Sequence, residues 1–145
     1  MANNNFKILE QYGALRRNLM LQVSCRIKDL PFGHRQMVML KTINKFGEIS
    51  LGKLAELVGT DPGTVSRSIA QMIELGWAEK EQSRSDGRLW KVRLTTKGQK
   101  QMPIIDEIYG TVADLMTGGL SDEEKEQFFN LLLKINGHFE KVNQK

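Results

Sequence analysis

Features typical of secreted, membrane-bound and disulfide-rich proteins are scarce in this 145-residue sequence. Its single cysteine, Cys25, cannot form an internal disulfide, so we expect the protein to work in a reducing cytoplasm. No apolar run approaches the roughly 20 residues that a transmembrane helix needs, which argues against insertion into a membrane. Residues 1–6 lack the basic and apolar segments of a secretory signal.

Residue groupings typical of enzymes and metal sites are also missing. The two histidines, His34 and His138, are isolated in the sequence, and the acidic residues show no metal-ligand spacing. No arrangement of a serine or cysteine with a histidine suggests a nucleophile and its base. We therefore predict no enzyme, no metal site and no cofactor.

The net charge of +4 is unevenly distributed along the chain. Residues 1–46 contain eight Lys and Arg against two acidic residues, and residues 47–100 contain nine against seven. Residues 101–145 reverse the balance, with four against eight. A basic front favours a polyanionic partner, and nucleic acid is the favoured one.

Residues 60–76 carry both start and stop signals for a helix. Asp61 can cap the N-terminus, Pro62 suits the first helical position, and Gly76 suits the position just after the end. One face is apolar, with Val65, Ile69, Met72 and Ile73 at helical spacing. The other face and its flanks carry Gly63, Arg67, Ala70, Thr64, Ser66 and Gln71. Small, hydroxyl and amide side chains with one arginine suit close approach to DNA, whereas an ordinary solvated surface helix is the alternative.

The neighbouring segments complete a known arrangement. Residues 51–58 are predicted to form a short helix capped by Ser50, and a tight glycine-containing turn leads into the next helix, which is the helix-turn-helix pattern. Before them, Glu48-Ile49 is long enough only for a bridging strand. Residues 79–82 and 90–94 follow as two strands around the basic turn 83–88. We therefore predict a winged helix-turn-helix, mainly α with a small β-hairpin wing.

Long apolar helices are predicted at both ends of the chain. They cover residues 6–29 and, after a helix from Thr95 to about Met116 that Pro103 should kink or delay, residues 121–142. Their apolar surface exceeds what a small winged helix can cover, so we expect a two-fold dimer, with a larger monomer core as the alternative. We predict one domain over residues 1–145, with the winged helix at 34–98 and dimerisation helices at 6–29 and 99–142.

Taken together, these motifs resemble a MarR-type (multiple antibiotic resistance regulator) transcription factor over nearly the whole chain. The resemblance rests on Gln36 to Leu40; on Leu54-Ala55, Thr64-Val65-Ser66-Arg67 and Leu75-Gly76; and on Asp86-Gly87-Arg88 with Leu94-Thr95-Thr96-Lys97-Gly98. The last piece is the most specific, because it reproduces the wing signature of the family at its usual distance from Leu-Thr-x-x-Gly. Gly87 departs from the second basic residue common in that wing.

The resemblance implies a ligand-responsive homodimeric repressor that binds a pseudo-palindromic operator in double-stranded DNA. Helix 62–75 of each subunit would enter the major groove, and Arg88 would enter the flanking minor groove with Asp86 orienting it. The residues assigned to DNA binding are Thr64, Ser66, Arg67, Gln71, Arg84, Asp86, Arg88, Lys91 and Lys53.

Regulation in this family usually runs through a small lipophilic or phenolic effector. The candidate pocket residues are Leu15, Leu19, Cys25, Met37 and Tyr109, with ordinary core positions as the favoured alternative. The resemblance also raises a peroxide-sensing role for Cys25, but no second cysteine is present to resolve a sulfenic acid, so we expect a core residue.

One alternative function stays open at this point. A winged helix can also bind another protein within a transcription assembly. Salt dependence separates the two functions, since DNA binding should weaken about 10³-fold or more between 50 and 200 mM salt when six or more phosphates are neutralised.

Overall fold

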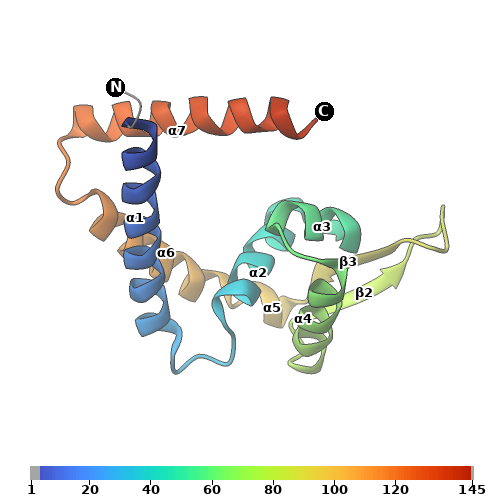
Figure 1. Ribbon diagram of the computed structural model, residues 1–145. Coiled ribbons are helices and arrows are strands. Elements are labelled where there is room, and N and C mark those ends of the chain that lie inside the picture. The colour runs from blue at the N-terminus through green and yellow to red at the C-terminus, as the bar shows by residue number, and fades with distance from the viewer. Residues whose placement is uncertain (1–3, 145) are drawn as a thin grey trace. The chain divides into compact units, whose positions relative to one another are not determined.

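The computed structural model describes residues 4–144 and is mostly helical, with one small antiparallel sheet (Figure 1). The residues expected to lack a secretory signal therefore lie partly outside the described residues. The helices are α1 (Asn4–Ile27), α2 (His34–Phe46), α3 (Leu51–Val58), α4 (Pro62–Glu74), α5 (Thr96–Gln99), α6 (Met102–Thr117) and α7 (Asp122–Asn143). The strands are β1 (Glu48–Ser50), β2 (Ala78–Gln82) and β3 (Trp90–Leu94). The predicted fold class is confirmed.

The chain divides into two compact units within α6, one ending at Tyr109 and one beginning at Gly110. The first unit holds α1 to α5, the sheet and the start of α6, and the second holds the rest of α6 and α7. The division predicted from the sequence, with a winged helix at 34–98, stays a prediction.

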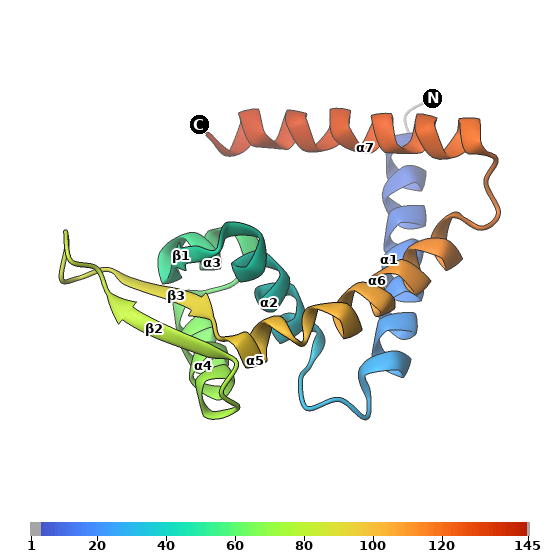
Figure 2. The ribbon, with the colours of Figure 1, turned by 180° about the vertical axis from the view of Figure 1, so that it is seen from behind.

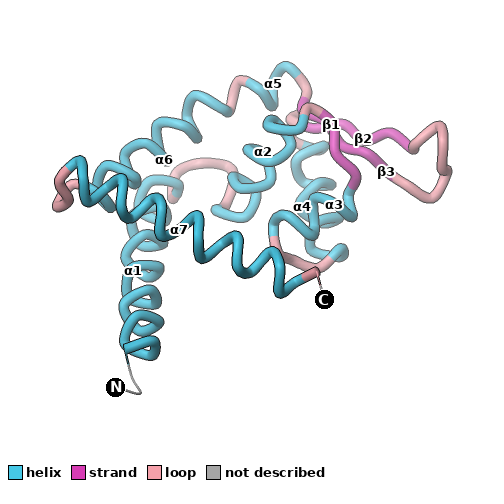
Figure 3. Tube along the Cα trace, turned by 90° about the horizontal axis from the view of Figure 1, so that it is seen from above, coloured by secondary structure: helices cyan, strands magenta, loops and turns pink. Residues whose placement is uncertain are grey.

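The sheet of the first unit has the strand order β1-β3-β2, and β3 pairs antiparallel with both neighbours. Val92 of β3 lies opposite Ile49 on one side and Lys80 on the other. Helices α2, α3 and α4 contact the strands, and the β2–β3 hairpin extends beyond them (Figures 2 and 3). The pairing of the short strand β1 with β3 agrees with the bridging strand expected at Glu48-Ile49.

The core of the first unit lies where these helices meet the sheet. Its fully buried large side chains include Met37, Leu40, Ile43, Leu54, Val65, Ile69, Met72, Val92 and Ile105. The apolar face predicted for residues 60–76 is thus the buried face of α4, and the polar face is left outward.

Both ends of α4 form as the sequence predicts. The carboxylate of Asp61 accepts a hydrogen bond from the backbone N–H of Thr64 at the N-terminus, with Pro62 in the first turn. At the C-terminus Gly76 has φ +75°, and the N–H of Trp77 donates to the carbonyl of Met72 at 2.8 Å. These caps fix where the outward face of α4 begins and ends.

The helix predicted from Thr95 to Met116 is divided in two. Thr95 caps α5, which is only four residues long, and α6 begins at Met102 with Pro103 as its second residue. Proline lacks an N–H and is tolerated only in the first turn of a helix, so Pro103 marks a new start.

The first half of α1 leaves large apolar side chains uncovered within the chain. Ile8 and Tyr12 are each 58% exposed, and Val23 is the buried residue of this helix. Cys25 is also exposed, so the expectation that it is a core residue is wrong for the single chain. Cys25 comes two positions after Val23 and therefore lies on nearly the opposite side of the helix.

The second unit presents a similar surface. Helix α7 begins with the predicted capping box of Ser121 and Glu124, and none of its described residues is buried. Among the described residues, no helix combines the length and apolar character that crossing a membrane requires.

Candidate nucleic-acid interface

The first turn of α4 carries a connected set of polar side chains. The hydroxyl of Thr64 donates to Asp61 Oδ2 at 2.6 Å and accepts a hydrogen bond from Arg67 Nη2 at 3.1 Å. The hydrogen bond from the Thr64 side chain, followed by that from its backbone, lowers the pKa of Asp61, which therefore stays ionised. These hydrogen bonds hold Arg67 at the N-terminal end of the outward face of α4.

Glycine at position 63 lies beside the carboxylate of Asp61 and the guanidinium of Arg67. A Cβ added to Gly63 would lie 3.2 Å from Asp61 Oδ1 and 3.5 Å from Arg67 Nη1. The guanidinium therefore lies along the helix surface toward the N-terminus. Of the other predicted residues of this face, Ser66 and Gln71 are exposed and Thr64 is half-buried.

Sequence reasoning missed one residue beside this face. Gln36, in the first turn of α2, donates from Nε2 to Oε1 of Gln71 at 2.6 Å. The spacing of Gly33 and Gln36 is that of a capping box, and this signal could have shown that the Gln36 side chain is fixed.

The wing turn is organised by backbone contacts. Oδ1 of Asp86 accepts the N–H of Arg88 at 3.0 Å, and the carbonyl of Asp86 accepts the N–H of Leu89 at 3.0 Å. The side-chain amide of Gln82 donates to the carbonyl of Gly87. Asp86 thus holds the backbone of Arg88 and not its guanidinium, which is exposed and has no ion pair with another described residue.

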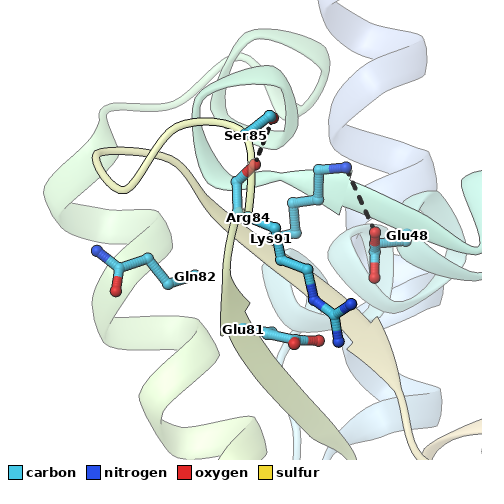
Figure 4. Close-up of a pocket in the computed structure, with 7 residues that line it drawn as sticks. Glu48, Glu81, Gln82, Arg84, Ser85 and Lys91 are labelled. Atoms are coloured by element: carbon cyan, nitrogen blue, oxygen red, sulfur yellow. Dashed lines mark hydrogen bonds and ion pairs between the residues drawn. The ribbon is translucent and has the colours of Figure 1, made fainter.

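The outer face of the sheet is rich in carboxylates (Figure 4). Arg93 contacts Glu79 at 2.7 Å, Glu81 at 3.5 Å and Glu48 at 3.7 Å. Lys91 pairs with Glu48 at 3.5 Å on this same face, so its charge is already partly balanced. A shallow groove of about 330 Å³ runs beside it, lined by Glu48, Glu81, Gln82, Ser83, Arg84, Ser85 and Lys91.

The remaining cations of the predicted interface also differ in whether a carboxylate balances their charge. Lys53 pairs with Glu56 of its own helix at 3.3 Å. Arg84 forms no ion pair with another described residue, although it lines the groove of the wing. Arg84 and Arg88 are therefore the two predicted wing cations whose charge no carboxylate of a described residue balances.

The five candidate pocket residues differ in burial, and their assignment to one pocket stays a prediction. Met37 is fully buried in the core, Leu15 and Leu19 are half-buried on α1, and Cys25 is exposed. Tyr109 is half-buried with Lys41 Nζ 4.9 Å from its ring centre, and burial raises the pKa of Tyr109. The grooves at the wing, beside the α1–α2 linker and between α2 and α6 are lined by other residues.

Comparison with known proteins gives a family match over the segment that contains α4 and the wing turn. The model of the MarR family matches residues 33–89, which run from the start of α2 through the wing turn. The chain is 31% identical over 93 residues to the HTH-type transcriptional regulator BilQ of Clostridium symbiosum (strain WAL-14163), covering 64% of this chain and 65% of that protein.

The chain resembles the MarR family. This is a family of DNA-binding transcriptional regulators and not of enzymes. Two solved structures share the MarR fold with it. A MarR transcriptional regulator from Methanosarcina mazei Go1 is 21% identical with a TM-score of 0.85, covering 93% of this chain and 97% of that one. A mutant MarR from E. coli, complexed with operator DNA, is 20% identical with a TM-score of 0.76, covering 92% and 96%.

Proposed function

We propose that two copies of this chain form a homodimer that binds a pseudo-palindromic operator in duplex DNA and represses transcription until an effector binds. The observation that carries the proposal is the outward face of α4. Its arginine is held by Thr64 and Asp61, and Gly63, Ser66 and Ala70 are too small to keep the helix away from a groove floor.

The wing supplies the second contact of each subunit. Arg88 and Arg84 lie on an exposed hairpin directly after α4. A guanidinium on such a hairpin suits the minor groove, where narrow A·T-rich segments concentrate negative potential. Lys53 and Lys91 would have to exchange Glu56 and Glu48 for phosphates, so we assign them a smaller part in binding.

The exposed apolar helices support the homodimer. Ile135, Phe139 and Val142 recur along one side of α7 and are 49%, 56% and 51% exposed. An uncovered apolar seam of this length is typical of a subunit interface. Two-fold pairing would place one copy of α4, the recognition helix of this proposal, in each of two successive major grooves.

The effector is part of the proposal because the resemblance to the MarR family implies one. A small lipophilic or phenolic compound would shift the dimer between DNA-competent and DNA-incompetent states. A set of simple phenols tests this part: an effector should raise the melting temperature and weaken DNA binding at the same concentration, and compounds that do neither are not effectors.

Selection of bound duplexes from a random DNA pool tests the homodimer and its operator binding. We expect a two-fold symmetric site, a sedimenting dimer at micromolar concentration, and binding that falls about 10³-fold between 50 and 200 mM salt. A monomer that enriches no symmetric site would overturn both.

A further inference from the structure

Two glutamines connect the start of α2 to the last turns of the recognition helix. Gln36 donates from Nε2 to Oε1 of Gln71 at 2.6 Å, and the N–H of Gly33 donates to Oε1 of Gln36 at 3.0 Å. Both side chains line an open groove of about 700 Å³ that also borders the α1–α2 linker. Gln71 is exposed on the flank of the face proposed to meet DNA.

The direction of this chain of hydrogen bonds is determined by its first member. A backbone N–H can only donate, so the atom of Gln36 that faces Gly33 must be the oxygen. The amino group of Gln36 then faces Gln71, and the atom of Gln71 that it meets must be an acceptor. The amide of Gln71 is therefore oriented with its oxygen inward.

The consequence concerns the group that Gln71 offers to a ligand. Its NH₂ has no hydrogen-bond partner among the described residues, whereas one lone pair of its oxygen is occupied by Gln36. A glutamine that reads adenine in a bidentate contact needs both its oxygen and its amino group at the base edge. With the oxygen turned toward α2, the amino group is what remains.

We propose that Gln36 is a positioning residue that presents Gln71 to duplex DNA as a hydrogen-bond donor, an inference that rests on the proposed function. The acceptor is an oxygen or nitrogen of the DNA. It is either a base edge, such as O6 or N7 of guanine or O4 of thymine, or a phosphate oxygen.

Gln36→Glu keeps the shape of the side chain but removes its donor, so it should reverse the direction of the hydrogen bond to Gln71. Glutamate keeps one oxygen for the N–H of Gly33 and is favourable in the first turn of a helix. Its second oxygen would meet the oxygen of Gln71, so the amide of Gln71 should turn over and present its oxygen to the DNA. Thermal melting of the variant checks that α2 still folds.

The added negative charge is separated from this effect by a double-mutant cycle with Gln71→Ala. Affinities are measured for the selected wild-type site and for all its single-base-pair variants, with wild type, Q36E, Q71A and Q36E/Q71A. The charge that Q36E introduces weakens binding by the same factor in both backgrounds, whereas the turned amide acts only where Gln71 is present.

We expect Q36E to change binding about tenfold more in the presence of Gln71 than in its absence. If the acceptor is a base edge, the preference at one symmetric position should move from guanine or thymine toward adenine or cytosine, which present amino groups. If it is a phosphate, the extra loss should be equal at every sequence.

Equal effects of Q36E in both backgrounds at every base pair would overturn the inference while leaving operator binding intact. A wild-type protein that selects no duplex at all would instead overturn the proposed function, and this inference with it.

Discussion

The backbone of Gly98 packs directly against the carbonyl group of Trp77. A Cβ at position 98 would overlap the carbonyl oxygen of Trp77 and lie 2.8 Å from its carbonyl carbon. Thr95 strengthens the same contact, because its N–H donates to the carbonyl of Trp77 at 3.0 Å and its hydroxyl to that of Gly76 at 2.5 Å. The segment after the wing is thereby joined to the end of α4.

Gly98→Ala should destabilise the protein by about 1–3 kcal/mol, because the new methyl group can be accommodated only by moving backbone. Urea denaturation followed by circular dichroism measures the change. Gly52→Ala is the matched control, since a Cβ there meets nothing within 4 Å and alanine favours a helix. A Gly98→Ala protein as stable as the control would contradict this packing.

This contact explains in physical terms why the Leu-Thr-x-x-Gly segment could be recognised from sequence. Thr95 serves as both a helix cap and a donor to the preceding turn, and Gly98 occupies a place where no side chain fits. The caps of α4 at Asp61 and Gly76 were predictable for the same reason, because each depends on residues a few positions apart.

What the sequence could not predict depends on contacts between distant residues. The bond from Gln36 to Gln71 joins positions 35 residues apart, and the pairing of Lys91 with Glu48 arises only because β1 and β3 are neighbours. The exposure of Cys25 was missed because its apolar neighbours in sequence lie on other sides of α1.

The lowered pKa of Asp61 predicts a specific response to acid. The hydrogen bond from the Thr64 hydroxyl, and then that from the Thr64 backbone, hold the pKa of this carboxyl below its ordinary value of 3.8. A carboxyl whose pKa is lowered by folding contributes stability above its unfolded pKa and loses it as pH falls through the folded one.

Asp61→Asn keeps a capping oxygen but removes this titration. The stability difference between wild type and Asp61→Asn should therefore be constant from pH 7 to about pH 5, and should shrink below about pH 4. Thermal melting across this range measures it. A difference that stays constant down to about pH 2.5 would show that Asp61 titrates normally.

The two wing cations of the groove should differ in their effect on salt dependence. Arg84 has no ion pair with another described residue, whereas Lys91 contacts Glu48. Arg84→Ala should lower the slope of log affinity against log salt by about 1, and Lys91→Ala by clearly less. Fluorescence anisotropy titrations between about 50 and 200 mM salt measure both slopes, and equal slopes would contradict the assignment.

The apolar seam of α7 should hold the subunits together. Phe139→Glu places a charge among residues that are apolar and about half exposed in the single chain, so sedimentation velocity should detect a monomer at concentrations where the wild type is a dimer. Lys134→Glu, on another side of the same helix, is the control and should remain a dimer. A monomeric wild type, or a dimeric Phe139→Glu, would remove the proposed interface.

Arg88 tests the wing itself. Its guanidinium is exposed on a turn that Asp86 holds through the backbone, so Arg88→Ala should leave the turn intact and remove only the charge and donors at its tip. We expect DNA binding to weaken by about tenfold or more in a gel-shift titration, because a minor-groove arginine is driven by local negative potential. Lys7→Ala removes the same charge from the start of α1, distant from the wing in sequence, and should leave the midpoint within about twofold. Equal losses for the two variants would mean that Arg88 acts only through net charge, and an unchanged midpoint for Arg88→Ala would mean that the wing does not reach the DNA.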